Sequence, residues 1–319
     1  MPDVVVIGGG PAGLSATLNL ARALVDVVLV DASRPRNSAT LRSHGFLTRD
    51  GIRPTELRSL AKAELSAYEN VEHLERRVVT SVRKDGDRFL VEIPGRAPSE
   101  LRTVSAAAVL LTTGLTETLP ALPSIRSYYG MSVFSCVACD AWDLRGRPLA
   151  LIGETPDLAR RAIHLARWTT DLTVFTNGAP VVTAAEGAAL SERGIRLERT
   201  AVTDLEGERG AVRSVLLEDG RSVPVEGGFV RPKWSVPAGF LDDIRPGTSA
   251  DGFVTTDDGG RTTVAGLYAA GDVAAPGPQQ MIIAAGDGAR VAAAIVGDLH
   301  FAGEDPSASA GRFHACHSS

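Results

Sequence analysis

The sequence predicts an α/β protein that contains two Rossmann-like nucleotide-binding units in series. Each unit consists of an apolar run, a turn that begins with glycine, a helical stretch and a second apolar run. The two units begin about 145 residues apart, at Val4 and at Leu149. A repeat of this kind is expected of two nucleotide-binding domains that follow one another along a chain.

The first unit runs from Val4 to Asp31. The apolar run Val4–Ile7 predicts a strand, a glycine turn follows, and the pattern predicts a helix over Ala12–Leu24. The apolar run Val27–Val30 predicts the next strand, which ends in Asp31.

The second unit repeats this order. Leu149–Ile152 predicts a strand, Gly153 opens the turn, and a helix is expected from about Asp157 to Trp168. Leu172–Phe175 predicts the strand that follows.

Further elements are predicted outside the two units. A polar helix is expected near Thr55–Tyr68, and an alanine-rich, tightly packed helix is expected over Gln280–Val296. The predicted strands are Val78–Val82, Arg88–Ile93, Ala106–Leu111 and Val264–Gly271. The tail from Ala302 is rich in serine, glycine and polar residues, and we expect it to be loosely held.

Composition narrows the class of protein. A chain of 319 residues that is 44% hydrophobic can bury the cores of two compact domains. The net charge of -5 argues against nucleic acid or an acidic membrane surface as a partner, so small molecules or proteins are favoured. The start of the chain has no secretory pattern, and no apolar run reaches the length of a membrane span. Three cysteines do not make a disulfide scaffold, so we expect a reducing compartment, the cytoplasm.

The first turn matches G-x-G-x-x-G between a predicted strand and a predicted helix. Gly8 is expected to make the tight turn, Gly10 to let the backbone approach a pyrophosphate, and Gly13 to let helix and strand pack closely. The helix N-terminus offers unpaired N–H groups to the phosphates, and Asp31 can accept hydrogen bonds from ribose hydroxyls. The alternative is a glycine-rich turn in an ordinary α/β protein.

A second motif, Gly266–Val273, resembles the flavin-binding segment of flavoproteins with two dinucleotide-binding domains. The resemblance implies that Asp272 bonds the ribityl chain of FAD and that the backbone around Gln280 and Met281 faces the flavin. A helix N-terminus there would stabilise negative charge on the reduced flavin. The alternative is a strand exit with a solvated aspartate.

Cys136, Cys139 and the adjoining Asp140 can carry redox chemistry. The thiolate is the nucleophile of thiol exchange, two cysteines so spaced lower the pKa of one of them, and a carboxylate can move the proton. A zinc site would need Cys316 or histidines as further ligands, and no second ligand pair accompanies this one. Two inert, buried cysteines are the other alternative.

This cluster resembles the active site of low-molecular-weight thioredoxin reductases. The resemblance implies that Cys139 lies against the flavin, that Cys136 exchanges with substrate and that Asp140 shuttles the proton. It also implies a thioredoxin reductase-like fold with a discontinuous FAD-binding domain, residues 1–117 and 245–319, and a second domain, residues 118–244, that carries the C-x-x-C motif. Relatives are homodimers, so a homodimer is expected by analogy.

The second glycine turn departs from that family. It reads Gly153-Glu154-Thr155-Pro156-Asp157-Leu158, which keeps only the first glycine and adds two carboxylates that would repel phosphate. No arginine follows the next strand at 176–178 to hold a 2'-phosphate, and Arg160 and Arg161 are expected to be solvated. The NADPH site is therefore predicted to be degenerate.

A kept flavin site beside a degenerate NADPH site resembles the dithiol oxidases that close disulfides in natural products such as holomycin and gliotoxin. The stretch Ser43–Gly51 also resembles the His-Gly-x-Leu-Thr-x-Asp-Gly stretch of that subgroup. The resemblance implies that a small dithiol attacks Cys136, that Cys139 passes the electron pair to FAD, and that O2 accepts it to give H2O2. Two alternatives stay open: a thioredoxin reductase-like enzyme fed by ferredoxin or another donor, and a redox-sensing flavoprotein without turnover.

The candidate site residues follow from these motifs, and no metal ligands are predicted. His44 is a candidate for flavin or substrate contact, although a lone histidine in a loop is as easily explained as a solvated side chain. We interpret His314 and His317 as solvated side chains. The catalytic candidates are Cys136, Cys139 and Asp140. The cofactor candidates are Gly8, Gly10, Pro11, Ala12, Gly13, Asp31, Ala32, His44, Thr113, Gly114, Gly271, Asp272, Gln280 and Met281.

Overall fold

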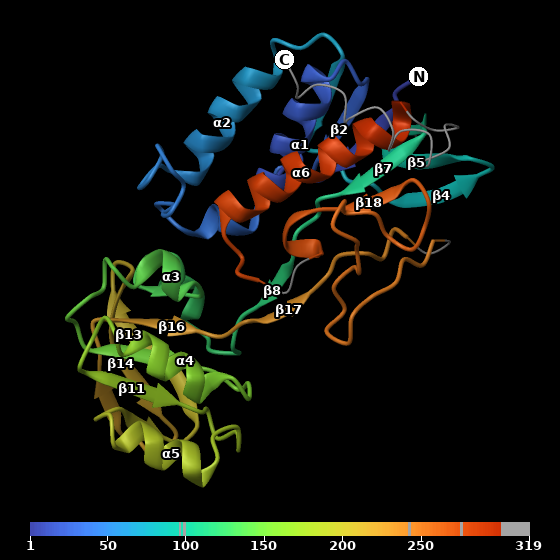
Figure 1. Cartoon of the computed structure of the whole chain (residues 1–319). Helices are drawn as coiled ribbons and strands as arrows, with labels where there is room; N and C mark the ends of the chain where they lie inside the picture. Colours follow the sequence, from blue (N-terminus) through green and yellow to red (C-terminus); the bar gives the residue numbers. More distant parts are fainter. Residues whose placement is uncertain (96, 98–99, 242–243, 275–276, 301–319) are drawn as a thin grey trace, which may run out of the picture.

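The computed structural model describes residues 1–95, 97, 100–241, 244–274 and 277–300. Within these ranges the chain forms two lobes that are joined by a pair of strands (Figure 1). Each lobe is built on a parallel five-stranded sheet, as the two repeated units predict. The tail from Ala302, with His314, Cys316 and His317, lies outside the described residues.

The sheet of the first lobe has the strand order β18-β7-β1-β2-β3. The strands are β1 (Val4–Ile7), β2 (Val27–Asp31), β3 (Val71–Glu75), β7 (Ala108–Leu111) and β18 (Leu267–Ala269). Val5 and Ile7 of β1 enter one hydrophobic core, while Val4 and Val6 enter another on the opposite face. Burial on both faces explains why this strand is a continuous apolar run rather than an alternating one.

Helices cover one face of this sheet and a small antiparallel sheet covers the other. The helices α1 (Pro11–Arg22) and α6 (Met281–His300) pack side by side, with α2 (Pro54–Leu65) next to α1 (Figure 1). The antiparallel sheet consists of β4 (Ser81–Asp85), β5 (Arg88–Pro94) and β6 (Leu101–Ala106). A short 3-10 helix, η1 (Arg36–Ala39), follows β2, and another, η3 (Gly271–Val273), follows β18.

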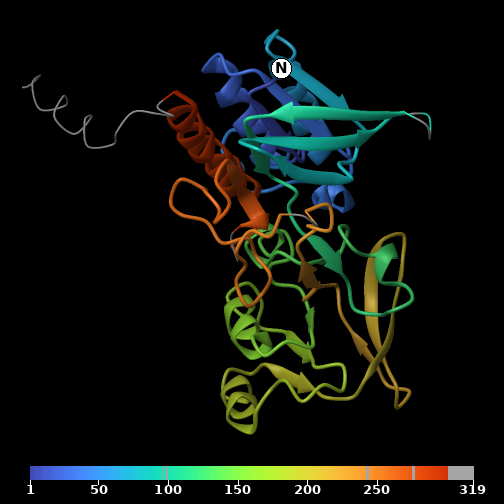
Figure 2. The ribbon, with the colours of Figure 1, turned by 90° about the vertical axis from the view of Figure 1, so that its right-hand side faces the viewer.

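The second lobe repeats this architecture with the strand order β12-β11-β10-β16-β9. Its strands are β9 (Val133–Phe134), β10 (Leu149–Ile152), β11 (Leu172–Phe175), β12 (Arg196–Glu198) and β16 (Gly227–Val230). One core contains residues of α3 (Val137–Asp140), α4 (Leu158–Leu165) and α5 (Ala184–Ser191). The other contains residues of the antiparallel strands β13 (Val202–Glu208), β14 (Ala211–Leu217) and β15 (Ser222–Pro224), with the 3-10 helix η2 (Ile125–Ser127) beside them. Figure 2 shows the two lobes one above the other.

Two antiparallel strands connect the lobes. β8 (Thr116–Thr118) leads into the second lobe, and β17 (Lys233–Ser235) leads back to the first (Figure 1). β18 and α6 then complete the first lobe from the far end of the sequence, so this lobe is discontinuous. The boundaries near residues 117 and 244 stay predictions.

Several element predictions need correction. β4 begins at Ser81 rather than Val78, whose side chain is 60% exposed, and the strand expected over 264–271 is limited to Leu267–Ala269 between two glycines with positive φ. β6 was not predicted because its first three residues are exposed and break the apolar alternation. Among the described helices, none is both long and apolar enough to cross a membrane.

Candidate active site

A cavity of about 710 Å³ runs between the two lobes. The first lobe contributes the glycine turn, Asp31 and the start of α6, and the second lobe contributes the C-x-x-C segment. Of the predicted site residues, Gly13 and Gly271 do not line this cavity. The others do: Gly8, Gly10, Pro11, Ala12, Asp31, Ala32, His44, Thr113, Gly114, Cys136, Cys139, Asp140, Asp272, Gln280 and Met281.

The first glycine turn keeps its backbone open toward the cavity. A Cβ on Gly13 would lie 1.9 Å from the carbonyl oxygen of Gly8, so only glycine allows α1 to pack this close to the turn. A Cβ on Gly10 would meet nothing within 4 Å, which leaves room for a ligand. Gly10 caps α1 without a side-chain hydrogen bond, and Pro11 stands at the first helical position. The N–H groups of the first helical turn are therefore left for a phosphate.

Asp31 lies at the end of β2 and is 4% exposed. Its carboxylate accepts hydrogen bonds from the backbone N–H of Ser33 at 2.8 Å and from the Arg58 guanidinium, and His73 lies 3.8 Å away. Burial raises the pKa of Asp31, but the nearby His73, the hydrogen bond from the Ser33 backbone and the charge of Arg58 outweigh it and bring the pKa to about 2. Asp31 therefore stays ionised and is held by Arg58, which the sequence alone did not indicate.

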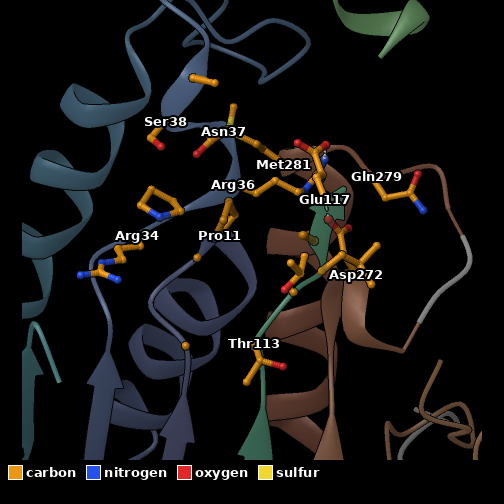
Figure 3. A pocket seen from close by; sticks show the side chains of 18 of the residues that line it. Pro11, Arg34, Arg36, Asn37, Ser38, Thr113, Glu117, Asp272, Gln279 and Met281 are labelled. Carbon is orange, nitrogen blue, oxygen red and sulfur yellow. Dashed lines mark hydrogen bonds and ion pairs between the residues drawn. The ribbon is translucent and has the colours of Figure 1, made fainter. Parts of the chain in front are cut away.

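Asp272 forms an ion pair with Arg36. Like Arg58, Arg36 was not indicated by the sequence motifs. The Arg36 guanidinium donates to Asp272 at 2.8 Å and to Glu117 at 3.0 Å (Figure 3). It also lies over the Trp234 ring. Burial raises the pKa of Asp272, and the positive charge of Arg36 opposes that shift. Arg36 thus ties η1 to η3 and to both connecting strands.

The cavity fits FAD on grounds independent of sequence motifs. The hydroxyl of Thr113 is buried at the cavity wall and has no hydrogen-bond partner among the residues that the structure describes. The open space at Gly10 and the uncapped start of α1 lie along the same cavity. An extended dinucleotide would fill that space, take its phosphates to the α1 N-terminus and bring its reactive ring toward the cysteines.

Cys136 and Cys139 form a disulfide at the other end of the cavity. Cys136 precedes α3, and its Sγ accepts a hydrogen bond from the backbone N–H of Cys139 at 3.2 Å. The preceding Ser135 bonds the Tyr129 hydroxyl at 2.9 Å, and Tyr129 donates to Glu117 at 2.8 Å. The disulfide therefore faces the predicted flavin site and is linked through Glu117 to Arg36.

Asp140 directly follows the disulfide and lines the same cavity. Burial raises the pKa of Asp140 to about 7, the charge of His44 opposes the shift, and the charge of Asp143 adds to it. A carboxyl group with this pKa can take up and release a proton near neutral pH. His44 itself bridges the lobes, since its Nε2 lies 3.1 Å from Asp143 and its Nδ1 lies 3.4 Å from Asp50.

The second glycine turn is filled by side chains of the chain itself. Leu158 is fully buried, and a Cβ on Gly153 would lie 2.9 Å from its Cδ1. Asp157 accepts hydrogen bonds from Thr155 at 2.6 Å and from Arg161 at 2.7 Å. Arg161 is therefore paired rather than simply solvated as expected, while Arg160 is exposed.

Charged groups close the other side of this turn. Glu154 accepts a hydrogen bond from Asn177 at 2.7 Å, and Lys233 lies 3.8 Å away. Arg231, which follows β16, lies 3.5 Å from Asp157. The two carboxylates therefore already have partners, Leu158 fills the space beside Gly153, and the Arg231 Nε is buried with no hydrogen-bond partner among the described residues.

Comparison with known proteins identifies the family. Residues 2–288 match the model of the pyridine nucleotide-disulphide oxidoreductases, and the chain belongs to this family. It is a thioredoxin reductase-like flavin oxidoreductase, and its cofactor is FAD.

One relative and two solved structures illustrate the similarity. The chain is 31% identical over 180 residues to a "Probable thioredoxin reductase" of Arthroderma benhamiae, a match that covers 55% of this chain and 44% of that protein. The structure of a thioredoxin reductase TrxB of Bacillus anthracis is similar at 35% identity and a TM-score of 0.87, covering 94% of this chain and 99% of that one. The structure of HlmI is similar at 33% identity and a TM-score of 0.86, covering 94% and 92%. These matches confirm the predicted fold.

Proposed function

We propose that this flavoprotein oxidises a small-molecule dithiol to an intramolecular disulfide in natural-product biosynthesis or self-protection, with O2 as the electron acceptor. The observation that carries the proposal is the contrast between the two glycine turns. The first is open beside the disulfide cavity, while the second is filled by Leu158 and by paired carboxylates. We expect a second turn filled in this way not to hold NADPH, so electrons enter from a thiol substrate instead. The similarity to the HlmI structure supports the link to natural-product chemistry.

The cysteine pair performs the exchange. One substrate thiolate attacks the Sγ of Cys136, the Cys136–Cys139 bond breaks, and Cys139 leaves as a thiolate. The second substrate thiolate then attacks the substrate sulfur bound to Cys136, which forms the product disulfide and releases Cys136. The substrate has lost an electron pair, and the cysteine pair has gained it.

Asp140 handles protons in these steps. Because its pKa is about 7, both forms of Asp140 are present near neutral pH, and the ionised form can accept the proton of an incoming thiol. Its neutral form can protonate a departing thiolate. The chemistry that FAD supplies when bound is acceptance of the electron pair from the cysteines and its transfer to O2, which yields H2O2.

The test mixes the aerobic, FAD-loaded protein separately with NADPH, reduced ferredoxin and dithiothreitol, and it records flavin absorbance and peroxide. We expect peroxide with dithiothreitol only, and we expect Cys136→Ser to lower that rate by a factor on the order of 10³ or more without loss of FAD. Rapid flavin reduction by NADPH would contradict the proposal. Reduction by ferredoxin alone would favour a ferredoxin-fed reductase instead.

A further inference from the structure

His44 is held in place by the loop that presents it to the cavity. The loop closes through the backbone pair of Ser43 and Ile52, and the N–H of Gly45 donates to Asp50 at 2.8 Å. Gly45 adopts a φ of 74°, which sets the turn that follows His44. The His44 side chain is 18% exposed and belongs to the cavity wall. Its position is therefore built by the loop rather than left to solvent.

The imidazole of His44 lies between two carboxylates from different lobes. Nε2 is 3.1 Å from Asp143, which follows α3, and Nδ1 is 3.4 Å from Asp50 of its own loop. A protonated imidazole can donate to both carboxylates, while a neutral ring can donate to one. The Asp50 and Asp143 side chains are 71% and 56% exposed, so both are in contact with water.

His44 lines the same cavity as Cys136, Cys139 and Asp140. Its charge opposes the burial that raises the pKa of Asp140, and Asp143 adds to that rise. The ionisable groups around His44 are thus Asp140, Asp143 and Asp50, together with the thiols of the cysteine pair once it is reduced. His44 therefore shares a cavity with the half-buried Asp140 and contacts two acids that water reaches.

The proton balance of the proposed dithiol oxidation indicates a role for His44 and the acids around it. Oxidation of a dithiol to a disulfide releases two electrons and two protons, and reduction of O2 to H2O2 consumes two of each. A single carboxyl group, that of Asp140, can hold only one of these protons. The second needs another acceptor or a path to water between the two half-reactions.

We propose that His44 is a positioning and proton-transfer residue of the redox site, which exchanges protons with Asp140 on one side and with solvent, through Asp143 and Asp50, on the other. The inference rests on the proposed dithiol oxidation. It assigns the loop histidine to the acid–base machinery rather than to flavin contact alone.

The test measures flavin reduction by dithiothreitol under anaerobic conditions, in stopped flow, from pH 5.5 to 9. The variant is His44→Gln, whose side-chain amide can donate to Asp143 but cannot titrate. We expect a rate lower by a factor on the order of 10 to 10² at neutral pH, a pH profile that loses one ionisation, and an unchanged dependence on dithiothreitol concentration. In His44→Ala, added imidazole should restore part of the rate.

The matched control is His164→Gln. His164 is exposed on α4 and packs edge-on against Trp168, so this variant should behave as the wild type. If His44→Gln releases FAD, Asp143→Asn is measured in its place over the same pH series, because Asp143 lies on the other lobe. We expect the pH profile of this variant to be displaced from that of the wild type. An unchanged profile in the variant measured, or no rescue by imidazole, overturns the role of His44 alone. A wild-type flavin that dithiothreitol does not reduce overturns the dithiol oxidation as well.

Discussion

The two glycine turns of this chain share the same architecture, but the side chains around them differ. α1 begins at Pro11, three residues after Gly8, and its first turn has no side-chain cap. α4 begins at Leu158, five residues after Gly153, and the intervening Asp157 accepts hydrogen bonds from Thr155 and from Arg161. Both turns connect a buried parallel strand to a helix. Retention of a fold therefore does not imply retention of the ligand, because a few side chains decide whether the backbone N–H groups stay available.

The largest expected effect comes from giving the first turn a residue of the second. Gly13→Leu places a Cβ 1.9 Å from the Gly8 carbonyl and mimics Leu158, so we expect FAD content to fall to background. The ratio of flavin to protein absorbance measures this. Gly297→Ala on α6, where a Cβ meets nothing within 4 Å, is the control and should keep its FAD. A Gly13→Leu protein that is fully loaded with flavin would show that a leucine at this position does not close the turn to a dinucleotide.

Asp140 and Asp157 are predicted to respond differently to pH, because only Asp157 has its charge compensated. The pKa of Asp140 in the folded protein is about 7, above the unfolded value near 3.9, so its contribution to stability is full below about pH 4 and is lost as pH rises to about 7. The loss is roughly 4 kcal/mol. Asp140→Asn should remove this pH dependence, as measured by urea unfolding of the oxidised protein between pH 4 and 9. Parallel stability curves for variant and wild type would contradict this assignment.

The smallest effect is expected in the second turn. The bonds from Thr155 and Arg161 outweigh the burial that raises the pKa of Asp157 and lower it overall, so its contribution to stability is present above the unfolded pKa and is lost on acidification. Asp157→Asn should cost about 1 kcal/mol in the free energy of unfolding at pH 7. It should leave NADPH unable to reduce the flavin, because Leu158 still fills the turn. If NADPH becomes a donor for this variant, charge rather than shape closes the site.

The sequence predicted the parts of the molecule that are local in the chain. Apolar runs such as Val4–Ile7 and Leu149–Ile152 predicted the buried strands, and the glycine spacing predicted the first turn. The pairing of Asp157 with Arg161 could also have been found, since the two are four residues apart on one helix face.

Long-range contacts in the site could not be predicted in this way. Arg36, Glu117 and Asp272 come from three segments that are distant in the sequence, so their spacing does not predict the ion pairs between them. The same holds for His44 and Asp143, which meet only because the lobes face each other. The raised pKa of Asp140 depends on burial between the lobes, which composition does not reveal.

In the proposed function, electrons enter through Cys136 and not through a pyridine nucleotide. The most direct test of this proposal is an anaerobic titration of the FAD-loaded protein in one cuvette, with excess NADPH added first and dithiothreitol second, while flavin absorbance is recorded. The proposed function predicts no change on addition of NADPH and full bleaching after dithiothreitol. Bleaching by NADPH before any thiol is added would contradict it.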